Sequence, residues 1–395
     1  MTPIRQKVIS AAVAGMALAA LASGGAQAAA TAPVTAGSGF WPLSVTFPST
    51  SAGWALGSVT CAATGRCLAL RKTTDGGHSW SVSVLPTALV KGVAGADANG
   101  FTGLGVRFAD TRNGWIFGGD AVKLGGGDSS EPALWSTHDG GKHWTERHTS
   151  GIAYSILDLE AANGMAHLVA QNKTYGATIE SSPVGADHWH VSTSLKLGLP
   201  AGGSDLEAAI VLTGTHGWLI EGNDRGTTGS ARLAGGRWVA WTPPCASVGG
   251  GFSAPAAASA TELVASCVMG GYASPLSKSA PRGAKVGSTW LYVSSNGGES
   301  FKAGPELARK LDTFETVLAS PAPGTILVDE VAGGAENLKA SFDTGRHWQV
   351  VDKVDVATVD FASATEGFGI VDSTRGGTTM IATSDGGRHW HPVAF

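Results

Sequence analysis

The sequence holds little charge and few cysteines for its length. Only 15% of the 395 residues are charged, and the formal net charge is −4, so nothing in the composition favours nucleic acid as a partner. The four cysteines lack the short pairs that are typical of zinc sites. Neither a Gly-x-Ser-x-Gly elbow nor a phosphate-binding loop with its Lys-Ser/Thr is present. We therefore expect no metal and no cofactor.

The first thirty residues have the pattern of an export signal. A basic start with Arg5 and Lys7 is followed by an apolar stretch of about 14 residues, which is short of the roughly 20 that a membrane span needs. Small residues ending at Ala28 complete the pattern. We predict a signal peptide over residues 1–28 and a flexible lead-in over 29–39, with no membrane span after cleavage. The predicted location is extracellular, with cell-wall association or the periplasm as alternatives.

The cysteines fit an exported protein. Cys61 and Cys67 lie six residues apart, and Cys245 and Cys267 lie 22 apart. Three pairings are open in principle. We favour the local one, Cys61 with Cys67 and Cys245 with Cys267, because each pair could close one hairpin.

A short repeat with the pattern [S/T]-x-[D/N]-x-G-x-x-[W/F] runs along the whole chain. Five good copies end at residues 80, 144, 301, 348 and 390, and two worn copies occupy 182–189 and 231–238. The third position of the good copies is held by Asp75, Asp139, Asn296, Asp343 and Asp385, and the last position of four of them by Trp80, Trp144, Trp348 and Trp390. An Asp-Gly-Gly turn allows positive φ at Gly, and the carboxylate can accept N–H groups of its own turn. We interpret the copies as structural hairpin turns, so these residues are predicted to be structural.

A second element, apolar-x(5)-Gly-[W/F], precedes the boxes. It appears as Phe47…Gly53-Trp54 and Phe108…Gly114-Trp115, and again at 211–218 and 361–368. Short apolar segments bounded by Gly, Asn and Asp are typical of strands joined by tight turns. Seven units in the mature chain leave about 52 residues each, enough for four strands and their loops. The prediction is an all-β, seven-bladed β-propeller of four-stranded blades over residues 40–395, with six blades and an irregular insertion as the alternative.

The boxes resemble the Asp-box, or BNR repeat, of the sialidase-like β-propeller superfamily. With the Phe-x(5)-Gly-Trp element ahead of each box, residues 40–395 look most like the WD40/YVTN/BNR-like repeat proteins of secreted bacterial type. Sialidases of this superfamily need an arginine cluster to grip the substrate carboxylate. Arg66 and Arg71 are the only arginines of the mature chain before Asp75, and neither is followed by Ile-Pro. No catalytic residue of that family transfers to this chain, and we assign none.

Binding residues are expected in the loops of variable length, because rigid scaffolds usually carry function there. These loops join strands two and three of each blade and join successive blades. The candidates are Asp120, Asp128, Glu131, Asp224, Arg225, Tyr272, Arg282 and Lys285.

The sequence therefore predicts a secreted, non-catalytic, monomeric propeller that binds a protein or glycan through this loop face. Two alternatives stay open. One is a glycoside hydrolase with a non-standard carboxylate pair in the central pocket. Asp360 and the other acids are scattered over the blades, and the sequence does not show which of them lie close together. The other is an assembly or stability factor of an exported complex.

Overall fold

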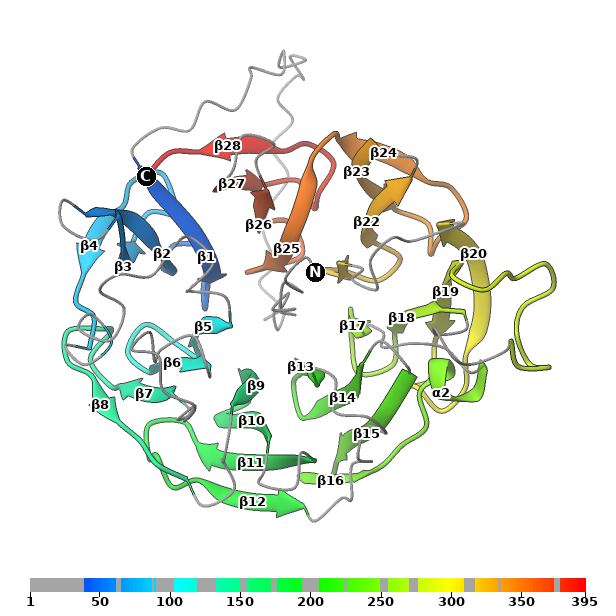
Figure 1. Cartoon of the computed structure of the whole chain (residues 1–395), viewed down its shortest axis with the longest axis horizontal. Coiled ribbons are helices and arrows are strands. Elements are labelled where there is room, and N and C mark those ends of the chain that lie inside the picture. Colours follow the sequence, from blue (N-terminus) through cyan, green and yellow to red (C-terminus); the bar gives the residue numbers. More distant parts are fainter. Residues whose placement is uncertain are drawn as a thin grey trace, which may run out of the picture.

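The computed structural model describes residues 39–61, 65–86, 89, 103–118, 133–149, 155–171, 176–193, 206–223, 226–248, 255–269, 276–308, 317–332, 335–372 and 377–395. In this part of the chain, seven antiparallel sheets of four strands each are arranged as a ring (Figure 1). The prediction of seven four-stranded blades is confirmed, and the six-bladed alternative is excluded.

Each blade consists of four strands that are consecutive in the sequence. Blades one and two contain β1 (Phe40–Thr46), β2 (Gly53–Cys61), β3 (Gly65–Thr73), β4 (Ser81–Ser83), β5 (Leu104–Phe108), β6 (Gly114–Gly118), β7 (Ala133–Thr137) and β8 (Thr145–Glu146). Blades three and four contain β9 (Ile156–Ala162), β10 (Met165–Gln171), β11 (Ala177–Pro183), β12 (His190–Thr193), β13 (Glu207–Thr213), β14 (His216–Asn223), β15 (Gly226–Ala234) and β16 (Arg237–Ala240). Blades five to seven contain β17 (Pro255–Ala257), β18 (Leu263–Val268), β19 (Thr289–Ser294), β20 (Lys302–Ala308), β21 (Leu318–Ala319), β22 (Ile326–Ala332), β23 (Ala335–Ser341), β24 (Gln349–Asp352), β25 (Asp355–Phe361), β26 (Gly367–Asp372), β27 (Thr378–Thr383) and β28 (His391–Val393).

The ring closes between blade seven and blade one through side chains. Figure 1 shows the C-terminus beside β1. The Thr378 hydroxyl donates to the carbonyl of Pro42, and the ring of Phe395 lies 4.5 Å from that of Phe40. The ring of Phe47 stacks on that of Phe368 at 3.5 Å. Among the described residues the first and last blades each consist of their own four consecutive strands, so these contacts connect the two blades.

The apolar-x(5)-Gly-[W/F] element is explained by packing between blades. Gly114 lies under the ring of Phe108 of the same blade, where a Cβ on residue 114 would be 2.5 Å from the ring. The other face of Phe108 stacks on Trp54 of the preceding blade, with 3.6 Å between ring centroids. The glycine thus makes room for an aromatic ring that is clamped by the neighbouring blade, which is the reason the two residues recur together.

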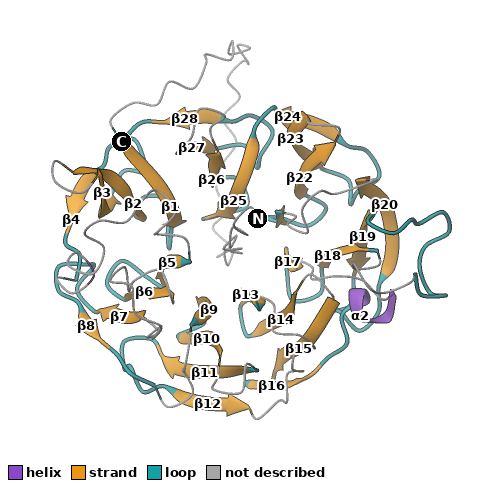
Figure 2. Ribbon diagram, viewed as in Figure 1, coloured by secondary structure: helices purple, strands orange, loops and turns teal. Residues whose placement is uncertain are grey.

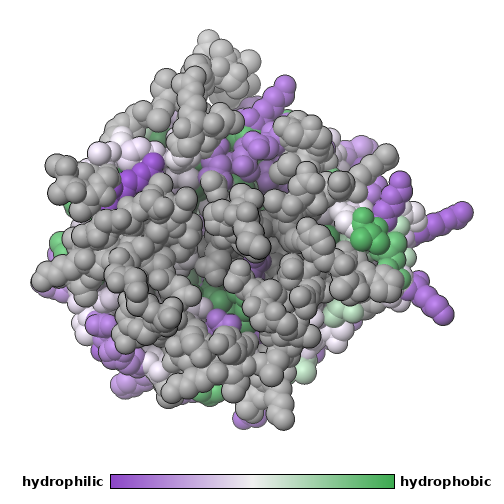
Figure 3. Space-filling view, viewed as in Figure 1, coloured by the Kyte–Doolittle hydropathy of each residue, from purple (hydrophilic) through white to green (hydrophobic). Residues whose placement is uncertain are grey.

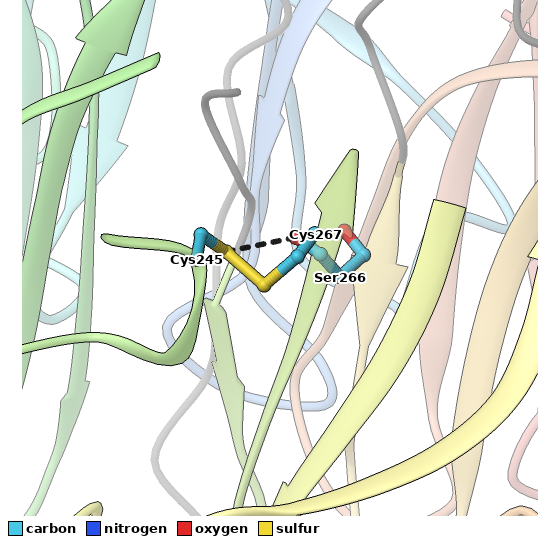
Figure 4. The surroundings of a disulfide bond; sticks show 3 residues. All are labelled: Cys245, Ser266 and Cys267. Atoms are coloured by element: carbon cyan, nitrogen blue, oxygen red, sulfur yellow. Dashed lines mark hydrogen bonds between the residues drawn. A yellow bond between two sulfur atoms is a disulfide. The ribbon is translucent and has the colours of Figure 1, made fainter. Parts of the chain in front are cut away.

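One short helix and a disulfide join blades four and five. Helix α2 (Pro244–Val248) follows β16 at the outer part of the ring (Figure 2). Its Cys245 is bonded to Cys267 in β18, as Figure 4 shows beside Ser266. The predicted pair is confirmed, but it fastens a connecting helix to the next blade, and it closes no hairpin. Cys67 is also disulfide-bonded, whereas the side chain of its expected partner Cys61 lies outside the described residues.

Candidate functional site

Four charged side chains meet at the inner strands and form what we call the hub: Arg107, Asp158, Glu160 and Asp360. The Arg107 guanidinium on β5 lies 2.8 Å from the Glu160 carboxylate on β9 and 3.4 Å from the Asp360 carboxylate on β25. Its Nε donates to the carbonyl of Leu159. Arg107 therefore links blades two, three and seven, although 253 residues separate it from Asp360.

The hub is buried and carries more acidic than basic groups. All four residues are at most 7% exposed. Asp158 accepts the backbone N–H groups of Ile210 and Leu159, but burial outweighs these bonds and raises the pKa of Asp158 to about 7. Burial likewise raises the pKa of Asp360. Burial opposes the charge of Arg107, yet the nearby Glu160 and Asp360 raise the pKa of the guanidinium. The single cation is thus held firmly charged among carboxylates.

Most of the hub was not predicted from the sequence. Asp360 was noted only as one of several scattered acids, and Arg107, Asp158 and Glu160 were not singled out. A signal did exist. Arg107 and Asp360 each stand one position before the phenylalanine that opens the second repeat element, at the end of the first strand of their blades. A charge at that position could have been marked as an inward-facing group in need of a partner.

The box residues lie further from the centre of the ring than the hub, in the turns between third and fourth strands. In the first box, Asp75 accepts bonds from the backbone N–H of Ser79 and the hydroxyl of Thr73. The Thr73 hydroxyl in turn accepts the N–H of Gly77 at 2.9 Å. The same pattern recurs around Asp139, Asn296, Asp343 and Asp385. Hydrogen bonds from Ser79 and Thr73 lower the pKa of Asp75 to about 2.

The box tryptophans pack against the aromatic residue of the second element. Trp80 meets Phe47, Trp144 meets Phe108 and Trp390 meets Phe361, each edge to face. The Nε1 groups of Trp80, Trp348 and Trp390 donate to a carbonyl of their own turn. The indole N–H groups of these three tryptophans are therefore hydrogen-bonded within the turn, and the box carboxylates are hydrogen-bonded within the same turn.

The worn third box has a different arrangement. Asp187 reaches into blade two, where its Oδ2 accepts from the Ser136 hydroxyl at 2.8 Å and lies 2.7 Å from His138 Nε2. The guanidinium of Arg147 lies 2.7 Å from the same carboxylate oxygen. Loss of the usual turn sequence is thus accompanied by an ion-pair network between two blades.

The predicted binding residues fall mainly in segments that the structure does not describe. Asp120, Asp128, Glu131, Asp224, Arg225 and Tyr272 lie outside the described residues. Arg282 and Lys285 are described and exposed, on the connection between β18 and β19. Only these two of the eight can be placed, and they lie on the face that carries the second-to-third strand loops.

One further acidic group is buried within blade four. Glu221 on β14 is 0% exposed, and among the described residues its carboxylate makes no hydrogen bond of good geometry, although the Thr228 hydroxyl lies close enough to favour its charged form. Burial raises the pKa of Glu221 to about 7. Within the described ranges, no group of three or more His, Cys, Asp or Glu is placed to hold a metal ion. Among the same residues, no helix combines the length and apolarity needed to cross a bilayer.

Comparison with known proteins shows the fold and leaves the family open. No protein-family model and no curated protein sequence matches the chain. YCF48 bound to D1 peptide is similar in structure, with a TM-score of 0.53 and 17% identity over 88% of this chain and 94% of that one. The β-propeller domain of the trilobed protease from Pyrococcus furiosus, reported with an open velcro topology, gives 0.54 and 6% identity over 90% and 96%. Acylaminoacyl peptidase from Pyrococcus horikoshii gives 0.52 and 7% identity over 90% of this chain and 52% of that one.

Proposed function

We propose that this chain is an exported propeller that binds a partner through its loop face and catalyses no reaction of its own. The observation that carries the proposal is that the carboxylates of the boxes and of the hub are already engaged in structural contacts. The box carboxylates accept hydrogen bonds within their own turns, and the hub carboxylates are buried around Arg107. A carboxylate that is hydrogen-bonded within its own turn, or buried against an arginine, is poorly placed to exchange protons with a substrate.

The disulfide between Cys245 and Cys267 is compatible with a location outside the cytosol, where such bonds persist. A propeller of similar fold has been solved with a peptide bound, which is consistent with a binding role for this scaffold.

A glycoside hydrolase is the second candidate, because of one specific observation. Glu160 and Asp360 bind the same guanidinium group, so two carboxylates do converge at the centre of the ring. Paired carboxylates at short separation are what glycoside hydrolysis needs. Their burial at 3% and 7% exposure and their shared arginine favour the structural role.

Two measurements on the mature protein separate these functions. A photo-crosslinking amino acid is placed on the loop face, at Lys353 or Arg282, and on the box side, at Lys142 or Arg237; all four positions are exposed. A binding propeller gives a discrete cross-linked species from the loop face in secreting cells and none from the box side. Turnover of a chromogenic glycoside that Asp360→Asn abolishes would instead establish the enzyme.

A further inference from the structure

The connection between β18 and β19 contains an ordered projection, residues 276–288, which we call the arm. It consists of three successive four-residue turns, each closed by a hydrogen bond from the last N–H to the first carbonyl: Ala280 to Ser277, Ala284 to Pro281, and Ser288 to Lys285. Gly283 and Gly287 supply positive φ at the third position of the second and third turns. The arm is therefore a built structure with a repeating geometry.

The arm is fixed to blade five at its base and along one side. The N–H of Gly287 donates to the carbonyl of Met269, and the N–H of Met269 donates to the carbonyl of Ser288. Leu276, Ala280 and Ala284 pack on the apolar cluster around the Cys245–Cys267 disulfide. The fourfold spacing of these three residues places them on the same side of the successive turns.

The opposite side of the arm is cationic. The corner positions of the three turns are Lys278, Arg282 and Val286, and Lys285 adjoins the last of them. All four are exposed, with Val286 at 60%. The arm contains no acidic residue, and no ion pair joins its three cations to another described residue. Figure 3 shows long hydrophilic side chains projecting beyond the edge of the ring where Figure 1 draws the arm.

We propose that the arm docks an acidic segment of a partner protein. The arm presents three positive charges on a chain whose net charge is −4, so an anionic partner is attracted to the arm more strongly than to the molecule as a whole. Val286 stands beside the cations, and a peptide offers apolar side chains next to its carboxylates, whereas an anionic polysaccharide offers charge with little apolar surface. This inference rests on the proposed binding function and names the partner chemistry of its loop face.

The test is the binding of a fluorescent twelve-residue polyglutamate peptide to the mature protein, measured by anisotropy at about 50 mM and 200 mM salt. The charge-reversed variant K278E/R282E/K285E is expected to bind at least about tenfold more weakly than the natural protein. The neutral variant K278Q/R282Q/K285Q is expected to fall between the two. The higher salt concentration is expected to weaken the binding of the natural protein only.

The matched control is K142E/R237E/R346E, which changes the net charge equally at exposed positions of the box turns. It is expected to change affinity less than about twofold. An equal loss in the control would overturn the inference, as would absence of peptide binding at low salt. Binding of dextran sulfate without binding of polyglutamate would overturn it in favour of a polysaccharide. If cross-links still form from Lys353 in those cases, the proposed binding function stands while the arm's role fails.

Discussion

The carboxylates of the box turns and those of the hub have opposite surroundings and opposite pKa shifts. At the box turns, Asp75 and Asp343 are exposed enough to stay hydrated and accept several hydrogen bonds, so their pKa values fall. At the hub, Asp158 and Asp360 are buried, and their pKa values rise despite the nearby Arg107. The same residue type thus stabilises a local turn at one place and fastens distant blades at another.

The difference lies in how far away the partners are. A box carboxylate finds its donors within four residues, so each box can form its turn by itself. The hub forms only when blades two, three and seven have come together. The box turns should therefore affect single blades, whereas the hub should affect closure of the whole ring.

The largest effect is expected when Arg107 is replaced by Met. The substitution leaves buried Glu160 and Asp360 without their cation, and loss of one partner of a buried ion pair costs about 3–5 kcal/mol. The free energy of unfolding in urea measures this loss. Arg232→Met is the control, because Arg232 is partly exposed and 3.8 Å from Glu299; it should cost less than about 1 kcal/mol.

A smaller effect is expected for Gly114→Ala, at the glycine that lies under the ring of Phe108. The new Cβ would overlap the ring of Phe108, and overpacking costs about 1–3 kcal/mol. Shortening the neighbour in the double variant Gly114→Ala/Phe108→Leu should recover part of the loss. Strict additivity of the two single changes in urea unfolding would contradict the proposed overlap.

For the box turns, Thr383→Val should cost about 1–2 kcal/mol. The substitution removes the hydroxyl that accepts the N–H of Gly387 and donates to Asp385. Thr379→Val, on the same strand but half-buried and without those bonds, should stay within about 0.5 kcal/mol. Thermal unfolding followed by circular dichroism can rank the two variants. Equal stability of both would show that the turn hydroxyl contributes nothing.

The pH dependence should separate the two kinds of carboxylate by the sign of the change in stability with pH. Because the folded-state pKa values of Asp158 and Glu221 are raised to about 7, their neutral forms favour the fold at low pH. Their contribution should be lost as the pH rises from about 4 to 7, by at most about 1.4 kcal/mol per pH unit for each group. The lowered pKa of Asp75 acts the other way, so its contribution is lost as the pH falls below about 4.

Glu221→Gln should flatten the decline between pH 4.5 and 7. Unfolding free energies measured in urea across this interval provide the comparison with the natural protein. An unchanged slope would mean that Glu221 ionises in the folded protein as it does in the unfolded one.

Much of the fold could be predicted from the sequence, because its determinants are local. The box and the Phe-x(5)-Gly-Trp element recur with fixed spacing, and each marks a turn whose bonds lie within a few residues. Those two patterns predicted seven blades of four strands. The short helix α2 has no such repeated pattern, so the connection between blades four and five was not predicted.

The hub and the interblade bridge could not be predicted in the same way. Arg107 meets Asp360 only because the ring brings the second and seventh blades together, and no spacing encodes that contact. Asp187 meets Arg147 for a similar reason, in a unit whose box is worn. Of the predicted binding residues, Arg282 and Lys285 lie on the arm, and their role stays a proposal.

The most direct test of the structural use of the hub is the unfolding free energy of the triple variant Arg107→Met/Glu160→Gln/Asp360→Asn. With these three charges removed together, neither Glu160 nor Asp360 is left as an unpaired buried charge, and the triple variant should regain a large part of the stability that Arg107→Met loses. A triple variant less stable than Arg107→Met by the sum of further losses would contradict the account, because the carboxylates would then contribute independently of their shared arginine.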